Sequence, residues 1–351
     1  MTAIMETYKR LPVAFVRGKG AHLFDEEGND YLDGLSGIAV AGLGHAHEGV
    51  AAAIKAQADQ LLHTSNLYKI PHQETLASRL TALSGMDSVF FGNSGAEANE
   101  AAIKIARLYG SSRDIKLPTI VVMDGSFHGR TMATLTATGN RKVQAGFEPL
   151  LGGFVRAPFG DVEAVRRIAA NNPDVVAVLT EPVLGEGGIH IPGENYLSEL
   201  RALCDEHDWL MMLDEVQTGN GRTGKYFAYQ HSDCLPDVVT TAKGLGNGVP
   251  IGACLARGRA AEILVPGTHG STFGGNPVAC AAGLATLQFI LDNNLLDRTL
   301  ILGDRIRKGV KQNFEGSDKL VDVRGQGLLI GFEVNKDCGH LVEEAKKHGL
   351  M

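Results

Sequence analysis

A lysine and an aspartate, each directly after an apolar run, are the residues of this sequence best suited to covalent catalysis. Lys243 stands in the glycine-rich segment TTAKGLGNG, and Asp214 ends the apolar run WLMMLD. A lysine amine can bind the aldehyde of pyridoxal 5'-phosphate covalently, and a carboxylate can keep the pyridine nitrogen of that cofactor protonated. The protonated ring then accepts the electrons released when a bond at the substrate's Cα breaks. The pair therefore predicts catalysis with pyridoxal phosphate.

A glycine at a predicted helix start indicates where the phosphate of such a cofactor would bind. Residues 93–100, NSGAEANE, lead from an apolar run into an amphipathic helical pattern. Gly95 allows a ligand to approach the backbone closely, and a helix start offers unpaired N–H groups and positive dipole charge. Ser94 and Glu97 also match an ordinary capping box, which needs no ligand. Only the combination with the lysine and the aspartate favours the phosphate.

Short β-branched runs alternate with longer helical patterns from about residue 88 onward. The strands are continuous apolar runs, which indicates an α/β fold with a mostly parallel central sheet covered by helices. Such sheets bind ligands at the carboxyl ends of their strands, so we expect the residues that follow these strands to meet in one crevice: 92–95, Asp124, Glu181, Asp214 and Lys243. The predicted strands are 88–91, 119–123, 175–179, 210–213, 238–241 and 251–256, and the predicted helices include 97–108, 162–170 and 196–206.

The two ends of the chain carry different patterns and predict a smaller α+β domain beside the large one. Apolar runs at 15–23 and 29–32 flank a turn and predict a hairpin. Helical patterns at 278–290 and 302–313 precede a predicted strand at 327–334, which needs neighbouring strands to be stable. The expected division is 1–50 and 277–351 for the small domain and 51–276 for the large, cofactor-binding domain.

Composition argues against several classes of partner. The 351-residue chain has a net charge of −7 and no basic stretch, which disfavours nucleic acid and anionic membranes. No apolar run approaches the ~20 residues needed to span a bilayer, and the first residues lack the apolar region of a signal peptide. The five cysteines are odd in number and lack C-x-x-C spacing, which favours reduced thiols and a cytoplasmic location.

Two other patterns suggest different chemistry. Residues 219–224, GNGRTG, match the G-x-G-x-x-G motif that binds nicotinamide dinucleotides after a strand. The residues that follow are a poor start for the helix this motif requires, and the acidic pair before it would repel a pyrophosphate. A nicotinamide-dependent oxidoreductase is therefore the remote alternative. His45, His47 and His128 are possible metal ligands, but no third ligand has suitable spacing, so we expect no metal.

Nine motifs stand in a fixed order along the chain. They are GIAVAGLGHAH, HTSNLY, FGNSGAEANEAAIKIAR, SFHGRT, EPVLGEGG, LDEVQTGNGRTG, TTAKGLGNGVPIGA, HGSTFGGNPVACAAG and VRGQGLLIGFE. In this order they resemble the class III (fold type I) pyridoxal-phosphate aminotransferases over essentially the whole chain, most closely those acting on N2-acetylornithine. The resemblance implies transamination of N2-acetylornithine with 2-oxoglutarate in arginine biosynthesis, giving N-acetylglutamate 5-semialdehyde and glutamate. Members acting on ornithine, succinylornithine or 4-aminobutyrate share most of these motifs and remain alternatives.

The resemblance also implies which residues hold the cofactor. Gly95 and Ala96 match the backbone pair at the cofactor phosphate, although the family often has threonine in place of Ala96. Phe127 matches the aromatic residue that stacks on the pyridine ring. Asp214 matches the residue at the pyridine nitrogen, and Lys243 matches the catalytic lysine that binds the aldehyde. The other implied contacts are Glu215, Val216, Gln217 at the ring hydroxyl, and Thr272, which would reach the phosphate of the other subunit of a homodimer.

Substrate contacts follow from the same resemblance. Arg130 and Ser271 match positions that bind acetylornithine, and a guanidinium suits a carboxylate because its fork donates two parallel hydrogen bonds. Glu186 matches an acid that pairs with an arginine and moves away when a dicarboxylate binds. The family continues beyond KKHGLM into strands that carry this arginine, which binds the substrate α-carboxylate. We therefore expect a C-terminally shortened chain, and an inactive relative is a third alternative.

Overall fold

The computed structural model describes residues 3–351 and has a seven-stranded sheet at its centre. Its strands are β4 (Ser88–Gly92), β5 (Thr119–Met123), β6 (Phe154–Ala157), β7 (Val175–Thr180), β8 (Leu210–Asp214), β9 (Val238–Thr241) and β10 (Gly252–Ala256). They lie in the order β4-β10-β9-β8-β7-β5-β6, and all neighbours are parallel except β10, which is antiparallel to β4 and β9. Every residue of β5, β7, β8, β9 and β10 is buried, which explains their continuous apolar sequences. The predicted α/β fold is confirmed.

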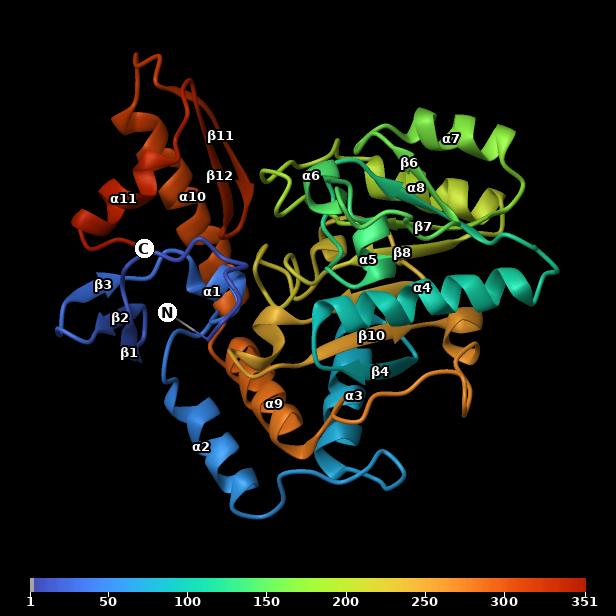
Figure 1. Ribbon diagram of the computed structural model, residues 1–351, viewed down its shortest axis with the longest axis horizontal. Helices are drawn as coiled ribbons and strands as arrows, with labels where there is room; N and C mark the ends of the chain where they lie inside the picture. Colours follow the sequence, from blue (N-terminus) through green and yellow to red (C-terminus); the bar gives the residue numbers. More distant parts are fainter. Residues whose placement is uncertain (1–2) are drawn as a thin grey trace.

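Helices cover both faces of the sheet because alternate residues of a strand point to opposite sides. The covering helices are α3 (Pro71–Ser84), α4 (Gly95–Ser111), α5 (Met132–Ala137), α7 (Val162–Asn171), α8 (Tyr196–Glu206) and α9 (Pro277–Asp292). Ile120 and Met212 pack with α4 and α5 on one face, whereas Val121 and Met211 belong to the core shared with α3, α7, α8 and α9. Figure 1 shows α4 beside β10 and β4, and α7 beside α8. No helix within residues 3–351 is long and apolar enough to cross a bilayer.

Both ends of the chain contribute to a smaller region beside this core (Figure 1). Its elements are β1 (Phe15–Lys19), β2 (His22–Asp25), β3 (Asp30–Leu32), α10 (Leu295–Asn313), β11 (Leu320–Gln326), β12 (Leu329–Val334) and α11 (His340–Lys347). Leu32 N donates to Gly349 O (2.7 Å) and Met351 N donates to Leu32 O (2.9 Å), so the last residues lie against β3. The expected domain division after residues 50 and 276 stays a prediction.

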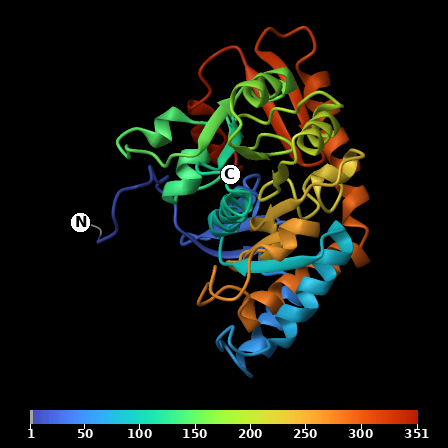
Figure 2. The same ribbon diagram turned by 90° about the vertical axis from the view of Figure 1, so that its right-hand side faces the viewer.

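The remaining helices of the described chain are short or lie near the N-terminus. They are α1 (Ser36–Ala39), α2 (Glu48–Ala58), α6 (Arg141–Gln144) and the 3-10 turns Ala228–His231, Lys243–Gly246 and Gly258–Glu262. Of these, α2 packs against α9. In Figure 2 the first described residues extend away from the rest of the molecule, and residues 3–10 are exposed.

The predicted large-domain strands agree with the structure to about one residue at each end, but three strands were missed. The predicted hairpin is a three-stranded sheet because Gly20, with φ +58°, turns the chain inside the first run. The four-residue strand β6 contains Arg156 and lies at the edge of the large sheet, so it lacks a continuous apolar run. Strand β11, LVDVRGQ, is the neighbouring strand that β12 needs. Its charged residues interrupt the apolar pattern, so the sequence does not predict a strand there.

Candidate active site

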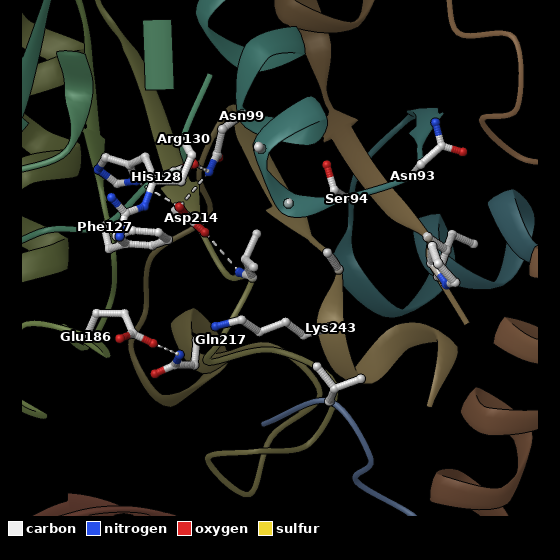
Figure 3. Close-up of a pocket in the computed structure, with 18 of the residues that line it drawn as sticks. Asn93, Ser94, Asn99, Phe127, His128, Arg130, Glu186, Asp214, Gln217 and Lys243 are labelled. Atoms are coloured by element: carbon white, nitrogen blue, oxygen red, sulfur yellow. Dashed lines mark hydrogen bonds and ion pairs between the residues drawn. The ribbon is translucent and has the colours of Figure 1, made fainter. Parts of the chain in front are cut away.

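A cavity of about 460 Å³ opens at the carboxyl ends of the central strands. Residues that follow β4, β5, β7, β8 and β9 line it, among them Glu181. Figure 3 shows Asp214 and Lys243 in this cavity. For residues 93–95, Glu181, Asp214 and Lys243 the expectation of one crevice is confirmed, whereas Gly92 and Asp124 do not line this cavity. The parallel strands β5, β7, β8 and β9 end at the same edge of the sheet, which brings residues distant in sequence together. Further lining residues are Val40, Asn93, Ser94, Val249, Pro250 and Ile251.

Lys243 lies just beyond β9 and extends into this cavity toward Gln217 (Figure 3). Its backbone has a φ of +42°, a left-handed conformation that is uncommon for a residue with a side chain and often marks a functional site. Burial lowers the pKa of the Lys243 amine, although nearby carboxylates, Glu186 first among them, oppose this shift. A lowered pKa increases the neutral fraction of the amine, which is the form that attacks an aldehyde.

Asp214, at the end of β8, is buried and held by a network of hydrogen bonds (Figure 3). Its Oδ2 accepts from Asn99 Nδ2 (2.7 Å) and lies 2.7 Å from His128 Nδ1, and its Oδ1 accepts from Val216 N (3.0 Å). Because an ionised carboxylate only accepts hydrogen bonds, His128 donates from Nδ1. Thr240 Oγ1 in turn donates to Asn99 Oδ1 (2.7 Å). These hydrogen bonds hold the Asp214 carboxylate in place in the wall of the cavity, and Lys243 extends into the same cavity.

The start of α4 forms another wall of the cavity. Ser94 Oγ accepts from Glu97 N (3.2 Å), as in the predicted capping box, but the Glu97 carboxylate accepts from Asn93 N (2.5 Å) and not from the N-cap residue, so only half of that box is formed. The Ser94 cap leaves the N–H groups of Gly95 and Ala96 without an acceptor in the helix, and both residues line the cavity. A Cβ at Gly95 would lie 2.7 Å from Val216 Cγ1, so glycine is required there. The helix start is therefore both capped and open to an anion.

Phe127 and Arg130 line the cavity from the loop that follows β5. The Arg130 guanidinium carbon lies 5.6 Å from the centroid of the Phe127 ring, within the range of a cation–π contact. Gly129 between them has a φ of +140°, and a Cβ there would lie 2.8 Å from the Ala96 Cβ. The exposed guanidinium can receive a carboxylate, and the partly exposed ring can stack on a flat ligand.

Glu186 and Gln217 face each other in the same cavity (Figure 3). Gln217 Nε2 donates to Glu186 Oε1 at 3.3 Å. The family resemblance implied an arginine as the partner of Glu186, whereas in the structure its hydrogen-bond partner is the Gln217 side-chain amide. Among the nearby carboxylates, Glu186 also has the largest effect on the pKa of the Lys243 amine. Gln217 is packed closely, since a Cβ at Gly185 would lie 2.0 Å from its Oε1.

Three predicted contacts lie outside this cavity. Glu215 points to the other side of the chain from Asp214, as successive residues of an extended segment do, and its carboxylate accepts from Thr218 Oγ1, Ala228 N and Tyr229 N at 2.5–2.9 Å. Ser271 lines a separate cavity of about 500 Å³, and its Oγ accepts from Asn93 Nδ2 (3.2 Å). Thr272, next to it, is exposed and lines neither cavity.

Two partners of Asp214 were missed as site residues. Asn99 lies inside α4, where the sequence shows only a polar residue in an amphipathic helix, and the sequence around His128 favours a turn or packing histidine over a metal ligand. Each is separated from Asp214 by many residues, 115 and 86 respectively, so no local pattern links them. The available signal was that each lies close in sequence to a predicted cofactor contact.

The glycine motif, His45 and His47, which suggested different chemistry, have ordinary structural roles in the fold, whereas His128 belongs to the network on Asp214. Residues 219–224 form turns, and the next element is a short 3-10 turn at Ala228–His231 rather than the helix that a dinucleotide needs. His45 pairs with Asp33 (2.6 Å), and His47 accepts from Val50 N at the start of α2 (3.4 Å). Along the described chain no group of three or more His, Cys, Asp or Glu side chains could hold a metal ion.

The burial of Glu215 predicts that stability falls as the pH rises. Burial raises the pKa of its carboxyl from 4.5 to about 7, so the folded protein retains a proton that the unfolded chain releases above pH 4.5. The folded state should therefore lose about 3 kcal/mol between pH 4.5 and 7 through this group, with no further loss at higher pH.

This loss is measured by urea unfolding of wild type and Glu215→Gln from pH 4.5 to 9. The difference between the two unfolding free energies should change with pH in the stated window, because glutamine does not titrate. A difference that is constant across the window contradicts the assignment.

Comparisons with known proteins agree with this geometry. A family model described as Aminotransferase class-III matches residues 3–351. The acetylornithine aminotransferase of Nitrosomonas europaea is 58% identical over 351 residues, which cover 100% of this chain and 89% of that protein. An ornithine aminotransferase structure from Toxoplasma gondii, with partial occupancy of PLP at its active site, superposes with a TM-score of 0.95 at 34% identity, covering 99% of this chain and 84% of that chain.

A structure of acetylornithine aminotransferase from Elizabethkingia anophelis is also similar. It has a TM-score of 0.89 and 35% identity, and the match covers 99% of this chain and 87% of that chain. The family that the sequence motifs resembled is therefore confirmed by sequence and by structure. The chain belongs to the class III aminotransferase family.

Proposed function

We propose that this protein binds pyridoxal 5'-phosphate in the cavity at Lys243 and transfers amino groups. The donor set fits the cofactor: the N–H groups of Gly95 and Ala96 suit a phosphate, and the Phe127 ring suits an aromatic face. The fixed anion of Asp214 suits a protonated ring nitrogen. The presence of Lys243 and Asp214 in one cavity carries this proposal.

Each residue then has a defined task. Bound pyridoxal phosphate withdraws the electrons released when a bond breaks at the carbon that bears the substrate's amino group. Lys243, with its lowered pKa, binds the aldehyde covalently and later carries a proton to and from that substrate carbon. Asp214 stabilises positive charge at the far side of the site, and Val216 and Gln217 complete the wall.

We propose N2-acetylornithine as the amino donor and 2-oxoglutarate as the acceptor, giving N-acetylglutamate 5-semialdehyde and glutamate in arginine biosynthesis. The 58% identity to a relative of that name supports this choice over ornithine, succinylornithine or 4-aminobutyrate. Arg130, exposed at the cavity, suits a substrate carboxylate, and Glu186 gives the site an acid whose contact with Gln217 can be exchanged for one with substrate.

The test combines spectroscopy with a comparison of donors. The purified protein should absorb in the visible range, lose that absorbance with borohydride, and then carry added mass on Lys243. Among the four donors, N2-acetylornithine should give the highest kcat/KM with 2-oxoglutarate. Failure to bind the cofactor overturns the proposal as a whole; a higher kcat/KM for another donor overturns only the substrate.

Replacement of Arg130 by alanine should weaken substrate binding. We expect KM for N2-acetylornithine to rise about 10- to 100-fold because a charge-assisted hydrogen-bond pair is lost, with a smaller change in kcat. Steady-state kinetics check this, with Arg305→Ala as the control because Arg305 is exposed on α10. An unchanged KM would show that the carboxylate binds elsewhere.

We also propose a homodimer in which Thr272 contacts the cofactor phosphate of the partner subunit. Its exposed position outside its own cavity supports this arrangement, as do nearby exposed apolar side chains: Phe273 is 59% exposed, and the ring of His63 lies 5.1 Å from it. Ser271 belongs to the same segment, whose backbone carbonyls accept from Asn66 Nδ2 at 3.0 Å.

Mixed dimers test this sharing of sites. A Lys243→Ala chain and a Thr272→Arg chain should each be nearly inactive alone, but co-expression should restore activity, since one of the two sites in a mixed dimer is intact. A monomer in analytical ultracentrifugation, or no recovery in verified mixed dimers, would overturn the proposal.

We place the reaction in the cytoplasm on the basis of the thiols. Within residues 3–351 no cysteine forms a disulfide, and Cys204, Cys234, Cys254 and Cys280 are buried. Burial raises the pKa of Cys254 to about 12, so its thiol stays protonated and unreactive. Fractionation of cells followed by immunodetection checks this location.

A further inference from the structure

Glu181 joins two loops of the active site that are far apart in sequence. It directly follows β7, lines the cavity, and is only 4% exposed. Its Oε2 accepts from Phe127 N at 2.9 Å, and its Oε1 accepts from Gly185 N at 3.0 Å. The first of these amides belongs to the loop that presents the aromatic ring, and the second immediately precedes Glu186. A single carboxylate therefore ties both loops to the end of the same strand.

The surroundings of Glu181 make this carboxylate costly to maintain. Burial, and secondarily the negative charge of Asp214, raise its pKa to about 7, and His128 and the two backbone hydrogen bonds only partly oppose this. Lys243 also faces this region, and its ammonium form is favoured by the charge of Glu181. No arginine or lysine forms an ion pair with Glu181 along residues 3–351. A buried acid without an ion-pair partner lowers stability, so its two amide contacts point to a role in the site.

We propose that Glu181 is a positioning residue that sets the Phe127 ring and the Glu186 carboxylate relative to each other by holding both backbone amides at once. The identity of the ligand under the ring rests on the proposed function, but the clamp itself does not. A carboxylate suits this task because its two oxygens only accept, so it can hold two N–H groups at the same time. The carboxamide of glutamine has one acceptor oxygen and would turn its NH2 group toward the other amide.

Hydrogen exchange tests the clamp directly. Above pH 7, where the Glu181 carboxyl is ionised, deuterium uptake by peptides containing Phe127 or Gly185 should be at least about tenfold faster in Glu181→Gln than in wild type, because a hydrogen bond to a charged group is lost. Helix α8, which lines no part of the cavity, serves as the internal reference and should be unchanged. Glu199→Gln is the matched control, since Glu199 is exposed on α8 and should change neither loop.

Two outcomes of the exchange experiment overturn the proposal. Unchanged uptake at both amides shows that Glu181 does not hold them. Faster uptake throughout, including α8, shows a general structural role only. These measurements are made on the protein with and without added pyridoxal phosphate, so the clamp is tested even if that cofactor is not the ligand.

A double-mutant cycle tests whether the clamp acts through the aromatic ring. Glu181→Gln and Phe127→Leu should each weaken pyridoxal phosphate affinity, the first by about tenfold. The double variant should bind pyridoxal phosphate clearly more tightly than multiplying the two separate losses of affinity predicts. Once the Phe127 ring has been removed, losing the hydrogen bond that positions it has no further effect on binding. Additive effects overturn the link to Phe127.

If Glu181→Gln does not fold, Glu181→Asp keeps the charge with a shorter side chain. It should retain protection at one of the two amides and lose it at the other. Equal protection of both amides, as in wild type, overturns the proposal.

Discussion

Replacement of Lys243 by alanine is expected to reduce turnover by about 10⁴-fold or more, since the residue serves both as nucleophile and as proton carrier. The structure gives the reason: the amine lies in the cavity at the ends of the strands, and its pKa is lowered by burial. The variant should also fail to hold pyridoxal phosphate covalently, although the N–H groups at the start of α4 and Asp214 remain. Borohydride reduction followed by mass spectrometry, together with steady-state kinetics, measures both losses.

Lys116→Ala is the matched control for this prediction, because Lys116 is exposed outside the cavity. It should keep both the covalent adduct and the turnover of wild type. Appreciable turnover by Lys243→Ala without an added amine would falsify the assignment of this lysine.

Substitution of Asp214 by asparagine should have the next largest effect, a loss of about 10³-fold in turnover, because a fixed charge opposite the reacting groups is removed. Asparagine has nearly the same volume as aspartate, but it cannot accept all the hydrogen bonds that the Asp214 carboxylate accepts. Asn99 Nδ2 and His128 Nδ1 both donate to the present Oδ2, so a carboxamide NH2 at this position would meet two donors. We therefore expect weaker cofactor affinity as well as slower turnover, measured by absorbance titration and by kcat.

The control for Asp214 is Asp233→Asn, which lies on the connection between β8 and β9 and is exposed. It should leave affinity and kcat unchanged. If Asp214→Asn retained wild-type kcat, the fixed anion would not be needed for the chemistry, and the predicted role of this residue would have to be abandoned.

The class of chemistry and most of the fold could be predicted from the amino-acid sequence alone. Continuous apolar runs predicted the bounds of the central strands to about one residue. A strand that is buried on both faces consists almost entirely of apolar residues, so its ends are marked by the first polar residue or glycine. Lys243 follows a predicted strand and Asp214 ends one. Because the carboxyl ends of parallel strands lie at the same edge of a sheet, both residues were expected at that edge, where the cavity lies. The capping residues Ser94 and Glu97 likewise indicated the start of α4, since capping is a local interaction.

The contacts between side chains depend instead on how the chain folds in three dimensions. Asn99 and His128 reach Asp214 from 115 and 86 residues away, and Glu181 reaches Phe127 across 54 residues. Glu215 turns away from the cavity although its neighbour Asp214 faces it, and β10 runs antiparallel within an otherwise parallel region. Local sequence governs backbone propensity and capping, whereas side-chain contacts depend on how distant strands and helices pack against one another. For that reason the chemistry of this site could be predicted from the sequence, but the network that orients it could not.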